Sequence, residues 1–274
     1  MMVEVLVHFV APALVGVLIG IASGLLGIGG GTVMVPIFRL AFGMSATMST
    51  ATSLFAIIPT SISGAISHAK GKTCIPALGI AAGLGGACMS PIGVWLAQLS
   101  PDWLVMLAAA LIIGYSAINM FKKAFKLRPA CQPVAEADAS ALTADDSSLS
   151  RKQLLQGAAI GLVAGLASGY VGVGGGFIMV PLMLSIIGIP MRKASGTSLI
   201  AVMILAIPGV IEQGIIGNIN YLAGIAIVIG TIPGAAIGAR LVTKVPERTL
   251  RLLFGCFLIV AAVMLVLNEV GIFG

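Results

Sequence analysis

Two glycine-rich runs are the residues of this chain best suited to bind a ligand. The first is GIGGG at residues 27–31, the second is GVGGG at residues 172–176, and a short apolar segment follows each. Glycine leaves the backbone uncovered and permits conformations that other residues avoid. A helix that begins after such a run points unpaired N–H groups and the positive end of its dipole toward the glycines. The pattern therefore predicts an anion site made largely from backbone.

Hydroxyl side chains that follow each short segment could add donors to this site. They form the runs STATS at residues 49–53 and SGTS at residues 195–198. A hydroxyl can hold the oxygen of an anion without a fixed charge. Ser and Thr in membrane helices also bond to backbone alone, so both interpretations stay open for the hydroxyls. The predicted substrate-binding residues are Gly29, Gly30, Gly31, Thr52, Ser53, Gly174, Gly175, Gly176, Thr197 and Ser198.

Close helix packing is the alternative explanation for the glycines. A dinucleotide site is excluded, because Thr32 and Phe177 stand where the last glycine of a GxGxxG motif is needed. Packing needs isolated glycines rather than adjacent ones, so we favour a ligand site for the two GxGGG runs. The glycines that we assign to helix packing are Gly16, Gly20, Gly79, Gly83, Gly224 and Gly234.

No other group of residues indicates chemistry. The apolar segments carry no carboxylate pair, no Ser/His/Asp set and no HExxH motif, so the sequence predicts neither an enzyme nor a metal or cofactor site. Glu212, His68 and Arg240 stand at segment ends, where we expect polar side chains to reach for the membrane surface, with contact to a ligand as the alternative. Cys88 and Cys256 fall within apolar segments, and we expect both to be buried packing residues.

The segments that must position these residues occur in two similar copies along the chain. At one constant offset, Ser23 aligns with Ser168 and residues 34–36 align with residues 179–181. Each copy has five apolar segments, of which the second is too short to cross a hydrocarbon core of about 30 Å. The predicted segments are 5–26, 31–42, 46–67, 75–99 and 103–121 in the first copy, and 154–171, 176–187, 194–211, 221–242 and 249–267 in the second. The chain divides into a first transmembrane repeat (1–122), a cytoplasmic linker (123–152) and a second transmembrane repeat (153–274).

Composition places the chain in a lipid bilayer. Charged residues make up 9% and apolar residues 59% of the 274 residues, against roughly 25% charged residues in soluble domains. We therefore expect an all-α polytopic membrane protein whose partners are lipid and a small anionic substrate. The excess of positive charge belongs to membrane orientation and does not indicate nucleic acid. Assembly into a homo-oligomer is left open.

Charge also predicts the orientation. With the linker in the cytoplasm, all but Arg39 of the 15 lysines and arginines fall on the cytoplasmic side, in agreement with the positive-inside rule. Each copy then crosses the membrane an odd number of times, so the two copies point in opposite directions. We expect two inverted-topology repeats around a site near the midplane, each with a short broken or re-entrant helix. Both termini would lie outside an inner, cytoplasmic membrane.

The segments GIGGGTVMVP (27–36) and GVGGGFIMVP (172–181), with the hydroxyl runs after them, resemble the TauE/SafE family of bacterial membrane transporters. The resemblance covers nearly the whole chain apart from the linker, and it is carried by the glycines together with Pro36 and Pro181. It implies an inner-membrane transporter, and characterised relatives are associated with export of sulfite, sulfoacetate and related sulfur anions. We therefore predict export of such an anion by alternating access. The alternatives are an anion channel and a membrane scaffold or assembly factor without cargo.

Overall fold

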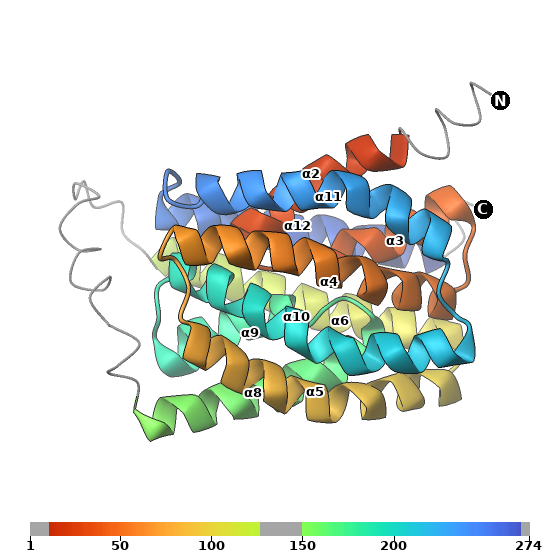
Figure 1. The fold of residues 1–274 in the computed structure, drawn as a ribbon, viewed down its shortest axis with the longest axis horizontal. Helices are drawn as coiled ribbons and strands as arrows, with labels where there is room; N and C mark the ends of the chain where they lie inside the picture. The colour runs from red at the N-terminus through yellow and green to blue at the C-terminus, as the bar shows by residue number, and fades with distance from the viewer. Residues whose placement is uncertain (1–10, 127–149, 270–274) are drawn as a thin grey trace.

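Every described element of the chain is a helix, and most helices run along the long axis of the molecule (Figure 1). The computed structural model describes residues 11–126 and 150–269. The first copy forms α2 (Ala11–Leu26), α3 (Gly31–Phe42), α4 (Ala46–Lys70), α5 (Pro76–Leu99) and α6 (Asp102–Lys126). The second copy forms α8 (Arg151–Val171), α9 (Gly176–Leu182), the π-helical turn η3 (Met183–Ile187), α10 (Met191–Ile216), α11 (Tyr221–Leu241) and α12 (Glu247–Glu269). Most of the predicted linker lies outside the described residues, and α6 and α8 extend into its two ends.

The described helices are those of a membrane protein that crosses the bilayer several times. Six of them, α4, α5, α6, α8, α10 and α11, are long and apolar enough to span. Large apolar side chains, among them Leu14, Leu155 and Ile215, are exposed on the outside of the bundle. Cys88 and Cys256 are exposed as well, so the prediction that they are buried was wrong. In a membrane protein the outer surface is itself apolar, and a small apolar residue needs no interior place.

The second segment of each copy is a short helix that turns back. In Figure 1, α3 returns toward the end of the bundle from which α2 comes, and α9 returns toward the end from which α8 comes. Helix α3 has 12 residues, and α9 has 7 residues before the chain enters η3. At 1.5 Å per residue α3 is about 18 Å long, which is too short to cross the bilayer.

The two copies pack into each other. Helix α5 contacts α8 and α10, while α11 contacts α2 and α4. In addition, α4 contacts α10 and α6 contacts α12. Since α2 to α6 align in sequence with α8 to α12, exchanging the copies leaves this set of contacts unchanged. The packing role predicted for several glycines is confirmed: a methyl group on Gly20 would lie 2.8 Å from Thr231 Cα, and one on Gly83 would lie 2.7 Å from Ile204 Cβ.

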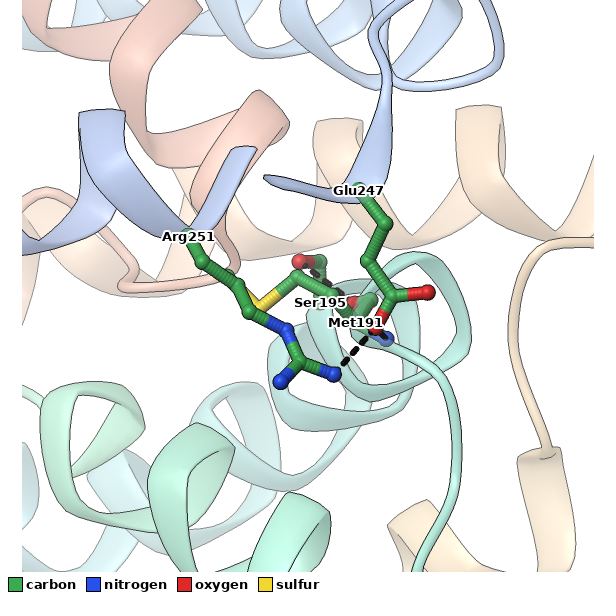
Figure 2. Close-up of polar contacts among 4 residues, drawn as sticks. All are labelled: Met191, Ser195, Glu247 and Arg251. Carbon is green, nitrogen blue, oxygen red and sulfur yellow. Dashed lines mark hydrogen bonds and ion pairs between the residues drawn. The ribbon is translucent and has the colours of Figure 1, made fainter. Parts of the chain in front are cut away.

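Helices α4 and α10 carry the two hydroxyl runs. In each copy, an acidic residue at the start of the last helix binds the first N–H group of this helix. Glu247 Oε1 accepts a hydrogen bond from Met191 N at 3.3 Å and forms an ion pair with Arg251 (Figure 2). In the first copy, Asp102 Oδ2 accepts from Ala46 N at 3.4 Å. The bond to Glu247 explains why α10 begins at Met191, before the start predicted at residue 194.

Candidate functional site

The two glycine turns contact each other. A methyl group on Gly31 would lie 2.5 Å from Val173 O, and one on Gly176 would lie 2.5 Å from Gly27 O. Real Cβ atoms essentially never come closer than 3.0 Å to such a neighbour, so only glycine permits this contact. All residues from 23 to 32 and from 171 to 177 are buried. Neither turn is therefore open to the outside in this conformation.

The backbone of the turns also requires glycine. The φ angles are 80° at Gly29 and 85° at Gly30, and they are 87° at Gly174 and 64° at Gly175. Any other L-residue would lose about 1–2 kcal/mol in this left-handed region. Gly30 and Gly175 are the N-cap residues of α3 and α9, and neither helix start has a side-chain cap. The first N–H groups of both helices must therefore find other acceptors.

Several of these backbone N–H groups have no acceptor among the described residues. The first hydrogen bond of α3 runs from Val33 N to Gly30 O at 3.3 Å. For the N–H groups of residues 28–32, the described part of the chain provides no acceptor. In the second turn Gly176 N donates to Gly174 O at 2.7 Å. Buried N–H groups without partners are rare in folded proteins, and they indicate a place where a ligand or water binds.

Of the predicted hydroxyls, Ser198 lies beside the first glycine turn. Ser198 Oγ donates to Gly27 O at 2.7 Å. In the other copy, a methyl group on Gly172 would overlap Thr50, and Ser53 follows Thr50 by about one helical turn on the same side of α4. Ser53 Oγ is buried and has no partner among the described residues. Ser53 thus occupies the position that aligns with Ser198, with its hydroxyl still available to donate.

The two threonines make a different contact. Thr197 Oγ1 accepts from Ile75 N at 2.9 Å, and Thr52 Oγ1 accepts from Asn220 N at 3.0 Å. Ile75 and Asn220 are the N-cap residues of α5 and α11, so each threonine holds the start of a helix from the other copy. Successive residues of a helix point about 100° apart, which separates each threonine from the serine after it. A role of these threonines in substrate binding stays a prediction.

Sequence reasoning missed two serines on the other side of the turns. A methyl group on Gly30 would lie 3.6 Å from Ser23 Cβ, and one on Gly175 would lie 3.4 Å from Ser168 Cβ. Both serine Oγ atoms are buried and have no hydrogen-bond partner in the described part of the chain. The sequence did contain a signal, since a serine stands one turn before the first glycine of the run in both copies. Further buried hydroxyls that find no partner among residues 11–126 and 150–269 are Thr32, Ser49, Ser61 and Ser90.

Charged side chains are almost absent from the interior. Lys193, at the start of α10, is the one buried Lys, Arg, Asp or Glu among the described residues. Arg240 is exposed near the end of α11, as expected for a residue that reaches the membrane surface. The same expectation for His68 was wrong, because its ring is fully buried and its Nε2 lies 2.7 Å from Gly24 O. Anion binding at the turns would therefore depend on neutral donors.

Helices α2 and α3 form a first helical hairpin, and α8 and α9 form a second. A cavity of about 810 Å³ lies beside the second hairpin. Its walls come from α5, α6, α8, α9 and η3 and are mostly apolar, with polar atoms from Ser116, Asn119 and Tyr170. Tyr170 OH donates to Ser100 Oγ at 3.0 Å. None of the glycines of the two runs lines this cavity, so it is separate from the predicted site.

Comparison with known proteins identifies relatives of this fold. The family profile described as Sulfite exporter TauE/SafE matches residues 12–265. The probable membrane transporter protein YunE of Bacillus subtilis is 27% identical over 274 residues, which cover 97% of this chain and 99% of that protein. A probable membrane transporter protein of Haemophilus influenzae is 30% identical over 279 residues, covering 93% of this chain and 97% of that protein. No solved structure gives a significant match. Because the profile covers both hairpins and nearly all the described helices, the chain belongs to the sulfite exporter TauE/SafE family.

Proposed function

We propose that the protein exports a small sulfur-containing anion, such as sulfite, sulfoacetate or a related organosulfonate, across the inner membrane by alternating access. The observation that carries this proposal is the contact of two glycine turns that have unpaired N–H groups and buried hydroxyls around them. Within the described residues, these N–H groups and the hydroxyls of Ser23, Ser53 and Ser168 are donors that lack acceptors. The oxygens of a sulfite or sulfonate group are acceptors, so such an anion would satisfy them.

The neutral character of the donors suits a substrate that must be released. Each hydrogen bond between neutral groups contributes about 0.5–1.5 kcal/mol net, and the N-terminus of a helix adds about 0.3–1 kcal/mol for a negative charge. A few such contacts give modest affinity, and a modest affinity allows fast release. A buried Lys or Arg at the turns would hold the anion more tightly and slow the cycle.

We further propose that the two copies are inverted repeats, with both termini outside. Three observations support this arrangement and orientation. The helix contacts are unchanged when the copies are exchanged. The hairpins α2–α3 and α8–α9 enter the bundle from opposite ends in Figure 1. Finally, all but Arg39 of the 15 lysines and arginines then face the cytoplasm, which satisfies the positive-inside rule.

The contact between the hairpins supports the proposal of alternating access. Both turns are buried here, so an anion can reach them only when one hairpin withdraws. Withdrawal of one hairpin would open the site toward its own side of the membrane, while the other hairpin keeps the opposite side closed. Export of a monovalent anion from an inside-negative cell is favoured by about 2.3 kcal/mol per 100 mV, so the membrane potential can drive it.

Flux measurements on purified protein in proteoliposomes test the function. We expect saturable, potential-dependent flux of radiolabelled sulfite or sulfoacetate, and counterflow when the opposite side holds unlabelled substrate. Flux without saturation or counterflow would favour an anion channel. If the protein moves none of these anions above the level of empty liposomes, the proposal is wrong and a scaffold role gains support.

A further inference from the structure

His68 is a buried ionisable residue that the proposed export mechanism does not use. Its ring is fully buried at the end of α4 that we place in the cytoplasm. Helix α2 contributes Gly24 O at 2.7 Å from Nε2, and α10 packs against the ring, since a methyl group on Gly196 would lie 2.9 Å from His68 Cγ. Ionisable residues enclosed in a membrane protein are costly and usually functional.

The partners of the ring suit both of its protonation states. A carbonyl oxygen only accepts, so Nε2 must carry a proton and donate to Gly24 O. Nδ1 lies 2.7 Å from Thr73 Oγ1, and this hydroxyl also lies 3.2 Å from His68 O. When the ring is neutral, the hydroxyl donates to Nδ1. When the ring is protonated, Nδ1 donates to the hydroxyl, whose own proton turns to His68 O. Neither state leaves a nitrogen unpaired.

The other copy closes the same turn without a histidine. Gln213 and Asn218 align with His68 and Thr73, and Asn218 Nδ2 donates to Gln213 Oε1 at 2.9 Å. The backbone bond is also the same, from Thr73 N to His68 O at 3.0 Å and from Asn218 N to Gln213 O at 3.1 Å. A glutamine cannot bind a proton at physiological pH, so of the two aligned residues His68 can titrate and Gln213 cannot.

The charged or titratable groups on the described elements that pack around the ring are Lys70 at the end of α4, Lys72 and Cys74 in the following turn, Arg192, Lys193 and Glu212 on α10, and Tyr221 and Arg240 on α11. Glu212 is the one acidic residue among them, and it lies more than four helical turns from Gly196 on α10. Helix α2 contributes none along its length. Within the described residues no ion pair involves His68, so a protonated ring has no fixed counter-charge.

We propose that His68 binds a proton together with the anion, so that protonation of the ring strengthens anion binding at the glycine turns. Gly24, which holds the ring, lies one helical turn before the first glycine run, and Ser198 on α10 connects that run to the helix that covers the ring. For two unit charges about 10 Å apart at an effective dielectric constant of about 20, the attraction corresponds to roughly a tenfold change in affinity. By reciprocity, a bound anion must favour the protonated ring by the same factor. The anion half of this inference rests on the proposed function.

Histidine NMR on the full chain in lipid nanodiscs tests the proton site directly. The chain has two histidines, so a His8→Gln background leaves His68 as the single signal. We expect a neutral ring with its proton on Nε2 at the alkaline end of the pH range in which the protein stays folded, and a reversible change to the protonated ring as the pH falls through that range. A Thr73→Val change removes the acceptor of the Nδ1 proton and should move the midpoint to lower pH by roughly one unit or less. A ring that stays in one protonation state across this range would overturn the proton site, whatever the protein transports.

Calorimetry with methanesulfonate, an anion that does not titrate in this range, tests the coupling. In the His8→Gln background, affinity should rise roughly tenfold from the deprotonated to the protonated ring, and saturating methanesulfonate should raise the NMR midpoint by about one unit. The matched control is His68→Gln, which installs the residue of the other copy and should bind methanesulfonate with an affinity that does not vary with pH. Binding whose pH dependence survives in His68→Gln would refute the coupling. Absence of any binding, with His68 still titrating, would overturn the coupling and the proposed function together.

Discussion

A single methyl group on Gly31 should force the two hairpins apart. Gly31 has no left-handed backbone requirement, so its replacement by alanine tests the contact alone. The methyl group would lie 2.5 Å from Val173 O and 2.6 Å from Ile57 Cδ1. The isoleucine can rotate away, but the carbonyl belongs to the backbone of the other hairpin. Because Cβ atoms essentially never approach within 3.0 Å, the tips must part by at least about 0.5 Å, the difference between 3.0 and 2.5 Å.

Overpacking of this kind typically costs about 1–3 kcal/mol. For a chain of roughly this length, each kcal/mol lowers the midpoint of thermal unfolding by about 2–4 °C, so Gly31→Ala should unfold roughly 2–12 °C below wild type. The assay is thermal unfolding of purified protein in nanodiscs, followed by intrinsic fluorescence. Sulfite flux should fall in the same variant, since displaced tips no longer present their N–H groups to one anion.

The control is the same substitution at Gly114 in α6, where a methyl group would meet no atom within 4 Å. Replacing a helical glycine by alanine without strain stabilises a protein by about 0.4–1 kcal/mol, so Gly114→Ala should unfold at or slightly above the wild-type midpoint. If Gly31→Ala unfolds at or above the wild-type temperature and transports normally, the turns do not touch in the working protein and the reasoning fails.

Three further predictions concern the site and its orientation. Replacing Ser23 and Ser168 together by alanine removes two unpartnered buried hydroxyls, so thermal stability should hold or rise while the KM for sulfite flux increases severalfold; a lower midpoint with unchanged KM would contradict this. Thr197→Ala leaves the buried Ile75 N without its acceptor and should cost about 1–3 kcal/mol of stability; a tenfold loss of anion affinity at unchanged stability would instead assign this hydroxyl to the site. In a cysteine-free background, Lys72→Cys should be protected from an impermeant thiol reagent in intact cells and labelled in inside-out vesicles, and the opposite pattern would reverse the proposed orientation.

The helices were predictable because apolar segments in lipid must be helical and must end where polar residues or glycines stand. The glycine turns lie where the runs at residues 27–31 and 172–176 place them, since glycine adopts those backbone angles freely and other residues lose about 1–2 kcal/mol there. The start of α10 was predicted too late, because the bond from Met191 N to Glu247 comes from a helix distant in sequence.

The side-chain roles were harder to predict, because they depend on direction around a helix. Thr197 and Ser198 are neighbours in sequence, yet Thr197 bonds to Ile75 N and Ser198 bonds to Gly27 O. The sequence contains no signal for which of the two faces the glycines until the packing of α10 is known. His68 was misjudged because its burial depends on tertiary packing: Gly24 is on α2, which lies against α4, whereas Thr73 is in the turn that follows α4.

The way the two copies pack has a consequence for biosynthesis. A ribosome delivers the first copy before the second exists, so α2 is made long before its neighbour α11, and α5 before its neighbour α8. The hydrogen bonds between Thr52 and Asn220 and between Gly27 and Ser198 likewise form only after the second copy has been made. The first half must therefore remain in the membrane as loosely associated helices until translation is nearly finished, and native packing arrives late. Either half made alone would be left incomplete, whereas the two halves made as separate chains would still carry every surface needed to assemble.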